Sequence, residues 1–313
     1  MSGAYVNIMF GKISHHFKVV KNSGQMISIF EESKREHKDT QNMPEESHAP
    51  FSAPINYVKG KFAVITDIRK AIKDEKIETY IQFLVSAQDK KEVGGELLAR
   101  WNHGRLGMLK PSLFVEVLES KEMMHDFDCY MIEKACQVLE DWSGLGAKMF
   151  LSCNVSRHTA EREDFPEFVK GLTEKYKFEG TRLILELTEY SKEKNRARLV
   201  ENMIAINELG VGFFLDDYGS GITSVLDWID FPLEAVKFDY SLTNSIFKEK
   251  GAIAVKNLVD ACHELGYKTV FEGIEEAQGV EIVTGMNGDI IQGFYFHKPI
   301  PTNLATMHLR DMR

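Results

Sequence analysis

The stretch LVENMIAINELGVGFFLDD, residues 199–217, shows the pattern that decides the fold. Leu199, Met203 and Ile206 recur at helical spacing. Gly210 follows them, where the C-terminal cap of a helix is expected. The next residues, VGFFLDD, form a short apolar run that ends in two aspartates and is typical of a buried strand. The stretch therefore predicts a helix that leads directly into a strand.

The same pattern recurs along the chain. Val255, Leu258 and Cys262 lie at helical spacing before Gly266, and the apolar run KTVFEG follows. The chain contains eight strand-like runs: TYIQFLV (79–85), VGGELLARW (93–101), KMFLSCNVS (148–156), RLILELTE (182–189), VGFFLDD (211–217), EAVKFD (234–239), KTVFEG (268–273) and DIIQGFYF (289–296).

Eight strand-like runs that are mostly separated by helices predict a parallel α/β fold. A TIM barrel needs eight such units and about 250 residues, and residues 61–313 supply them. A doubly wound open sheet is the competing architecture. Residues 31–55 are rich in charge, Pro, Ser and Asn, as in a linker. We therefore expect an N-terminal segment and linker over 1–60 and one domain over 61–313.

Composition excludes several classes of protein. The 313 residues include 38 Lys and Arg against 47 Asp and Glu, a net charge of −9. Binders of duplex nucleic acid or of anionic membranes are expected to be basic instead. The four cysteines form no CxxC pair, which favours a reducing, cytoplasmic location. No run approaches the ~20 apolar residues that a membrane span needs, so we expect no membrane insertion.

Polar side chains recur inside or at the ends of the predicted strands. Carboxylates in apolar strands are costly unless they are paired or bind metal. Because the carboxyl ends of parallel barrel strands share one face, these groups are expected to converge. They are Glu96, Asn154, Glu186, Asp216, Asp217, Lys237, Glu272 and Gln292.

Oxygen ligands of this kind suit Mg²⁺ or Mn²⁺, and no His or Cys set has zinc spacing. We expect the tandem Asp216 and Asp217 to point in different directions, so that one bridges two ions. Two such ions can promote phosphodiester hydrolysis. Lys237 would orient or deprotonate the attacking water, stabilise charge on the phosphate, or form a salt bridge. Met123, Met124 and Phe127 are interpreted as helix core.

Seven motifs, in order over residues 65–302, resemble those of EAL-domain cyclic-di-GMP phosphodiesterases. The first is ELLARWNH (96–103), with Leu97 where the family usually has Ala. The others are LSCNVS (151–156), LELTE (185–189), LDDYGSG (215–221), VKFD (236–239), EGIE (272–275) and IQGF (291–294).

The resemblance implies a modified TIM (β/α)8 barrel with one antiparallel strand. It implies hydrolysis of cyclic-di-GMP to linear pGpG with Mg²⁺ or Mn²⁺, which lowers the level of a bacterial second messenger. It also implies a homodimer through the loop that follows Asp217. Glu189 would brace this loop, which the family links to metal affinity as well.

The resemblance further implies roles for single residues. Glu96, Asn154, Glu186 and Asp216 would bind the first of two divalent cations. Asp216, Asp217 and Glu272 would bind the second. Lys237 and Gln292 would act on the hydrolytic water, with Glu272 also counted as catalytic. Gln82, Leu98 and Arg100 would contact the substrate.

Some positions depart from the family pattern without removing a ligand. Phe83 and Gly104 stand where Pro is usual, and Phe271 replaces a small residue before Glu272. Tyr218 and Ser220 replace the usual Phe and Thr of the loop. Phe271 is expected to alter packing under the second metal.

Two further expectations remain. Residues 17–30 resemble the last helix and strand of a GGDEF domain, or simply form a short helix and a strand, and no cyclase signature is present. The alternative to an enzyme is a catalytically inactive cyclic-di-GMP receptor, and a third reading is a protein-interaction module.

Overall fold

The computed structural model describes residues 3–10, 13–22, 26–31, 68, 70–104, 107–115, 118, 123–188, 193–220 and 224–312. The chain divides into two compact units, Met1–Ala63 and Val64–Arg313. The expected linker over 31–55 lies almost wholly outside the described residues. Among the helices that are described, none combines the length and the apolar character that crossing a bilayer requires.

The first unit contains a three-stranded antiparallel sheet of β1 (Gly3–Phe10), β2 (Ile13–Asn22) and β3 (Met26–Glu31). The helix expected from residue 17 onward is therefore a wrong prediction. Val19 pairs with Ala4 on one side and with Ile29 on the other. The β-branched pair Val19 and Val20 favours such a strand. This sheet removes the helix on which the GGDEF resemblance rested.

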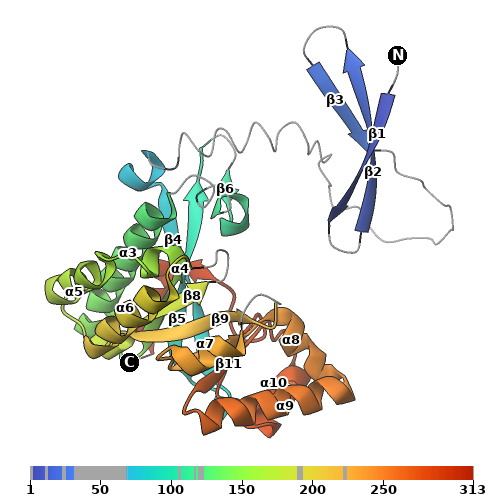
Figure 1. Cartoon of the computed structure of the whole chain (residues 1–313). Helices are drawn as coiled ribbons and strands as arrows, with labels where there is room; N and C mark the ends of the chain where they lie inside the picture. Colours follow the sequence, from blue (N-terminus) through green and yellow to red (C-terminus); the bar gives the residue numbers. More distant parts are fainter. Residues whose placement is uncertain are drawn as a thin grey trace. The chain divides into compact units, whose positions relative to one another are not determined.

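The second unit is built on a closed barrel of eight strands (Figure 1). All eight predicted strands are present. They are β4 (Ile77–Ser86), β5 (Glu92–Asn102), β7 (Phe150–Ser156), β8 (Leu183–Thr188), β9 (Gly212–Tyr218), β10 (Ala235–Phe238), β11 (Lys268–Glu272) and β12 (Ile290–Gln292). The short strands β6 (Met108–Leu109) and β13 (Ile300–Pro301) extend the sheet beside β5 and β4.

One barrel strand runs against the others. β4 pairs antiparallel with both β5 and β12, whereas every other neighbouring pair in the barrel is parallel. This confirms the modified TIM barrel with one antiparallel strand. It also places the amino end of β4 at the same face as the carboxyl ends of the other strands, since Ile77 pairs with Trp101 near the end of β5.

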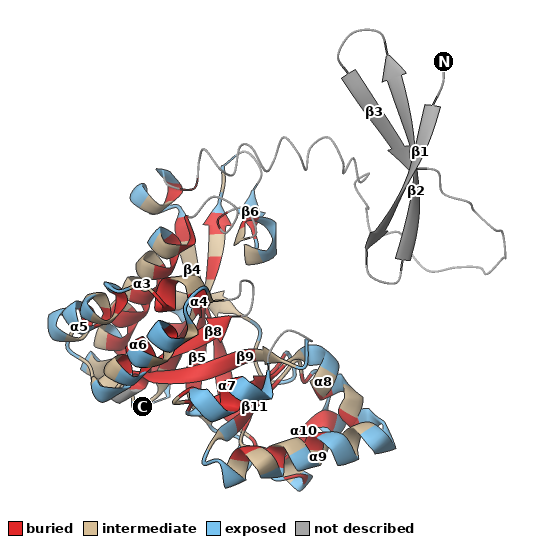
Figure 2. Ribbon diagram, viewed as in Figure 1, coloured by how far each residue is buried: buried red, intermediate tan, exposed pale blue. Residues whose placement is uncertain are grey.

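Helices cover the outside of the barrel and turn their apolar sides toward it. In Figure 2 the strands are largely buried and several helices show an exposed outer side. The helices are α3 (Met124–Gly144), α4 (Arg157–Ala160), α5 (Phe165–Lys175), α6 (Arg196–Glu208), α7 (Val225–Asp230), α8 (Tyr240–Asn244), α9 (Glu249–Glu264), α10 (Ala277–Gly285) and α11 (Thr302–Asp311), with 3-10 turns at Pro111–Leu113, Gly180–Arg182 and Ser245–Phe247.

The core has two parts because side chains alternate along each strand. One side of each strand faces the helices and joins a large outer core. The other side faces the barrel interior, where a small apolar cluster forms a floor. Its members are Leu84, Ile184, Phe214, Ala235, Val270 and Ile290.

The last barrel strand is shorter than predicted. The sequence predicts a strand over 289–296, but β12 ends at Gln292. Gly293 follows, and a Cβ there would lie 2.0 Å from the carbonyl oxygen of Ile274, so this close approach needs glycine. From this close contact the chain turns, and the amide of Phe296 donates to the carbonyl of Gly293. Phe294 and Tyr295 consequently remain exposed.

Candidate active site

The predicted polar residues form a layer directly above the apolar floor. Five of them, Glu186, Asp216, Lys237, Glu272 and Gln292, lie two positions further along their strands than a floor residue, so both members of each pair point into the barrel. Ile184 is followed by Glu186 and Phe214 by Asp216. On the antiparallel β4 the order is reversed, and Gln82 precedes the floor residue Leu84. The convergence predicted from the sequence is therefore present.

A bulge brings both aspartates of the tandem pair to this layer. On β9, Leu215 pairs with Val236 and Tyr218 pairs with Phe238, so Asp216 and Asp217 share the one position opposite Lys237. Asp217 has φ +52°, in the left-handed region that most residues avoid. Alternation alone would send the two carboxylates to opposite sides. The bulge instead lets both line the same cavity.

Lys237 lies at the centre of the carboxylates and is almost completely buried. Its Nζ donates to Glu186 Oε2 at 2.7 Å and to Asp216 Oδ1 at 2.9 Å. It also lies 2.7 Å from Glu272 Oε1 and 3.6 Å from Glu96 Oε2. Carboxylates from β5, β8, β9 and β11 thus share one ammonium group from β10.

Amide side chains complete the layer on the side of β4 and β5. Asn154 donates to Glu96 Oε1 at 2.9 Å, and Gln292 donates to Glu96 Oε2 at 2.7 Å. The Nε2 of Gln292 lies 3.5 Å from Gln82 Oε1. Gln82 in turn donates to the backbone carbonyl of His297 at 3.1 Å. These contacts fix both oxygens of Glu96.

Burial and neighbouring charges shift the pKa values of this cluster. Burial, aided by Asp216, raises the pKa of Glu272 to about 8, although Lys237 opposes the shift. Burial and the neighbouring Asp216 raise the pKa of Asp217 to about 6. Burial also raises the pKa of Glu186 well above its usual range. Burial alone would lower the pKa of Lys237, but the surrounding carboxylates raise it well above its usual range.

These residues fit divalent cations. One oxygen each from Asp216, Asp217 and Glu272 lies within 4.8 Å of the other two. Glu186 Oε1 is buried and has no hydrogen-bond partner among the described residues, as expected of an oxygen that is available to a cation. Carboxylate and amide oxygens are the ligands that Mg²⁺ and Mn²⁺ prefer.

The polar layer forms the base of a cavity of about 510 Å³. This volume lies in the range of about 300–1,000 Å³ that is typical of small-molecule sites. One wall is apolar and comes from η1 (Pro111–Leu113), from Val115 just after it, and from α3. It includes Pro111, Val115, Met124, Phe127 and Met131.

This apolar wall was not predicted from the sequence. Met124 and Phe127 were expected only in a helix core, but both also line the cavity. Asp128 was not predicted either, and its buried carboxylate accepts from the amide and the hydroxyl of Ser156. The one signal in the sequence was the acidic Asp128 on the apolar side of a predicted helix.

The remaining predicted residues have different positions. Gln82 and Leu98 line the cavity, whereas Arg100 does not. The Arg100 guanidinium donates to the carbonyl of Ala99 and lies 5.5 Å from the centre of the Tyr80 ring. Glu189 lies outside the described residues. Phe271 packs edge-on against Phe238 in the outer core, on the far side of β11 from the cavity.

Comparison with protein families gives one model that fits most of the chain. The model of the EAL domain matches residues 65–299. Among curated proteins, the oxygen sensor protein DosP of Escherichia coli (strain K12) is 24% identical over 254 residues, which are 80% of this chain and 32% of DosP. The cyclic di-GMP phosphodiesterase RocR of Pseudomonas aeruginosa is 26% identical over 239 residues, 76% of this chain and 61% of RocR. The chain therefore spans from about a third to three fifths of these relatives.

Solved structures agree with the barrel. The EAL domain protein from Listeria monocytogenes EGD-e has a TM-score of 0.67 and 28% identity, with 78% of this chain and 96% of that chain covered. The PaMucR phosphodiesterase in complex with c-di-GMP has a TM-score of 0.72 and 24% identity, with 77% and 99% covered. The second likeness shows the fold alone.

Proposed function

Because this chain belongs to the EAL domain family, we propose that it hydrolyses cyclic-di-GMP to linear pGpG with two divalent cations, Mg²⁺ or Mn²⁺. The observation that carries the proposal is the complete polar layer: carboxylates from four strands meet around Lys237 at the base of a cavity. The name of RocR as a cyclic di-GMP phosphodiesterase supports the choice of substrate.

The family resemblance suggests the two ligand sets, and the grouping of Asp216, Asp217 and Glu272 supports the second of them. Glu96, Asn154, Glu186 and Asp216 would hold one ion, and Asp216, Asp217 and Glu272 the other. Ions bound there would activate a water molecule and stabilise charge on the phosphodiester. The apolar wall formed with α3 would accept a flat base of the dinucleotide, and Gln82 would donate or accept a hydrogen bond at the opposite side.

Lys237 would act as a hydrogen-bond donor and a fixed positive charge rather than as a base. Four carboxylates keep its ammonium form charged. A charged ammonium orients the attacking water through that water's oxygen and offsets the negative charge that develops on the phosphate. Of the roles that the sequence left open for Lys237, this proposal keeps orienting the water and stabilising the phosphate charge, and drops deprotonation of the water.

The test is incubation of the purified full chain with cyclic-di-GMP and Mg²⁺ or Mn²⁺, with products separated by chromatography and an EDTA-treated control. Metal-dependent formation of pGpG is the expected result. No product in a chain that still binds the nucleotide by calorimetry would identify an inactive receptor. No binding at all would favour a protein-interaction module.

We also propose a homodimer through α7 and the loop that follows Asp217. Val225, Leu226 and Ile229 on this short helix are each more than half exposed, although apolar side chains prefer burial. Light scattering on the full chain should give twice the monomer mass, and Ile229→Glu should shift it toward the monomer.

The four thiols are free, which supports a cytoplasmic location.

A further inference from the structure

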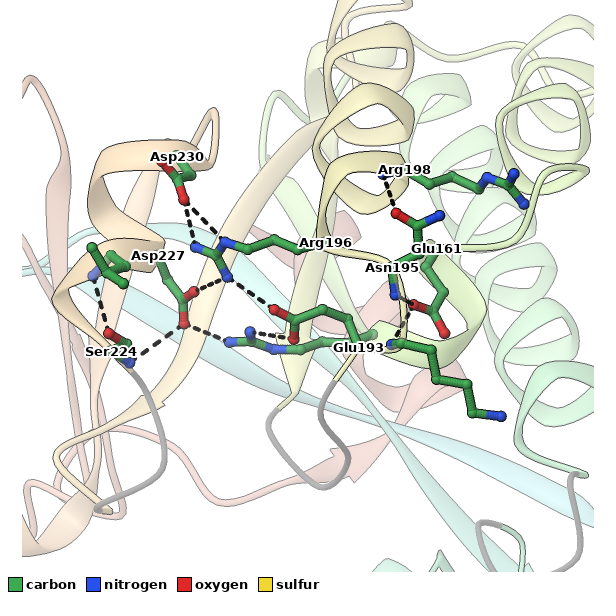
Figure 3. A network of polar contacts seen from close by, with 11 residues as sticks. Glu161, Glu193, Asn195, Arg196, Arg198, Ser224, Asp227 and Asp230 are labelled. Carbon is green, nitrogen blue, oxygen red and sulfur yellow. Dashed lines mark hydrogen bonds and ion pairs between the residues drawn. The ribbon is translucent and has the colours of Figure 1, made fainter.

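Four charged side chains near the cavity form a closed cycle, which we call the charge ring. Its members are Arg157, Glu193, Arg196 and Asp227. Arg157 contacts Glu193 at 3.1 Å and Asp227 at 2.8 Å. Arg196 contacts the other oxygens of the same two carboxylates, at 2.9 Å and 2.7 Å. Figure 3 shows Glu193, Arg196 and Asp227 turned toward one another.

One side of the charge ring is buried and the other reaches the surface. The side chain of Asp227 is 3% exposed and that of Arg157 is 8% exposed, whereas that of Arg196 is 32% exposed. Burial alone would raise the pKa of Asp227, but Arg157 and Arg196 hold it below its usual value. Buried ion pairs add little net stability because desolvation offsets their attraction, yet the loss of one partner leaves a costly unpaired charge. Such a ring therefore specifies position more than it adds stability.

The charge ring connects the segments that follow three ligand-bearing strands. Arg157 is the first residue of α4, after β7. Arg196 is the first residue of α6, after β8. Asp227 belongs to α7, after β9, where it also forms a capping box with Ser224. The ring of Phe231, which follows α7, lies 5.4 Å and 4.7 Å from the two guanidinium groups.

A direct path leads from the ring to the strained Asp217. Trp228 follows Asp227 and is buried, and its ring lies 4.7 Å from that of Tyr218. Tyr218 follows Asp217 directly, and it also packs against Phe238. The backbone carbonyl of Trp228 is fixed by the hydroxyl of Tyr267 at 2.7 Å. Trp228 is therefore held from two sides and packs against the residue that follows Asp217.

We propose that Arg157, Glu193, Arg196 and Asp227 are positioning residues for the second cation site. The charge ring fixes α7, α7 fixes Trp228, and Trp228 fixes the Tyr218 side chain. This packing holds Asp217 at its left-handed φ, so that its carboxylate lies beside those of Asp216 and Glu272. The inference rests on the proposed function, because it assumes that these three carboxylates bind a cation.

The test counts bound Mn²⁺ on the full chain by electron paramagnetic resonance, without nucleotide and well below the unfolding temperature. We expect two sites in the unaltered chain. Asp227→Asn should weaken one site by about tenfold or more, the scale seen when groups that support metal ligands are lost. The other site should keep its affinity. In turnover assays the half-saturating Mn²⁺ concentration should rise while kcat at saturating Mn²⁺ stays within about threefold.

Two controls separate positioning from stability. Val169→Ala removes buried apolar atoms from α5, away from the ring, and should lower stability without changing either Mn²⁺ site. Tyr218→Ala should reproduce the weak site, whereas Tyr218→Phe should not, and both remain informative if Asp227→Asn does not fold.

The outcomes distinguish the two proposals. An unaltered chain that binds no Mn²⁺ overturns the proposed function and this inference with it. Folded Asp227→Asn with the Mn²⁺ affinities of both sites unchanged would overturn the inference alone. An equal loss of affinity at both sites, reproduced by Val169→Ala, would overturn it as well.

Discussion

Lys237 and Glu186 are joined by a 2.7 Å contact at a position where neither side chain reaches water. Three further carboxylates lie within 4.0 Å of the same Nζ. The ammonium group therefore neutralises part of a cluster that is otherwise strongly negative, at the place where cations are expected to bind.

Lys237→Met should lower the free energy of unfolding of the EDTA-treated chain by about 3 kcal/mol, because it leaves buried carboxylates without their partner. Added Mn²⁺ should recover more stability in the variant than in the unaltered chain, since the ions replace the lost charge. Denaturant unfolding with and without Mn²⁺ measures both effects. Lys256→Met, which breaks an exposed pair with Asp260, should cost no more than about 0.5 kcal/mol.

Glu96→Ala should abolish turnover. Both carboxylate oxygens of Glu96 are held by amide donors in a fixed direction, so its loss removes a ligand that no neighbour replaces. We expect kcat to fall by about 10³ or more at saturating Mn²⁺. Glu167→Ala, at an exposed position on α5, should leave kcat unchanged. Substantial activity of Glu96→Ala at high Mn²⁺ would contradict the ligand assignment.

The EDTA-treated chain should lose stability as the pH rises. Glu272 has a pKa of about 8 in the fold, above its ordinary value of 4.5. Between these two values the folded chain binds the Glu272 proton more tightly than the unfolded chain. The contribution of Glu272 to the free energy of unfolding is therefore full below about pH 4.5 and is lost as the pH rises to about 8. Asp217, with a pKa of about 6, adds the same trend at lower pH. Denaturant midpoints from pH 5 to 8.5 test this.

Two comparisons make the pH experiment specific. Glu272→Gln should flatten the dependence, because an amide does not titrate. Saturating Mn²⁺ should stabilise the chain more at pH 8 than at pH 6, because metal ligands must lose their protons to bind. A stability that rises with pH in EDTA would show that these carboxylates are not shifted upward.

Gln82→Ala should weaken substrate binding more than turnover. Gln82 lines the cavity and is oriented by the carbonyl of His297. We expect KM to rise about tenfold, the equivalent of one to two hydrogen bonds, with kcat within about threefold. Gln88→Ala, in the turn between β4 and β5, is the matched control and should change neither constant. A drop in kcat alone would place Gln82 in the chemical step instead.

The sequence predicted the eight barrel strands and the polar layer because both follow from local patterns. Apolar runs with carboxylates such as Glu186 and Asp216 need no knowledge of distant contacts. The bulge at Asp217 was not predictable, since it depends on how β9 pairs with β10. The short β12 depends likewise on the turn after Gln292, where the amides of Phe296 and His297 donate to the carbonyl of Gly293.

The charge ring could not be predicted from the sequence for a related reason. Asp227 bonds to Arg157, 70 residues earlier in the chain. Only its capping box with Ser224 is local, and that pattern indicates a helix start rather than a buried ion pair. Strand β2 shows a second limit of local patterns. The sequence of residues 18–22 fits either a helix or a strand, and pairing with β1 and β3 makes it a strand.

The reversed direction of β4 determines at which face of the barrel the preceding part of the chain enters. In an all-parallel barrel, the first strand would begin at the face opposite the active site. Here Ile77 begins β4 beside Trp101, at the rim where the other strands end. The segment that immediately precedes Lys76 therefore enters at the face of the barrel that carries the polar layer, without crossing the packed core.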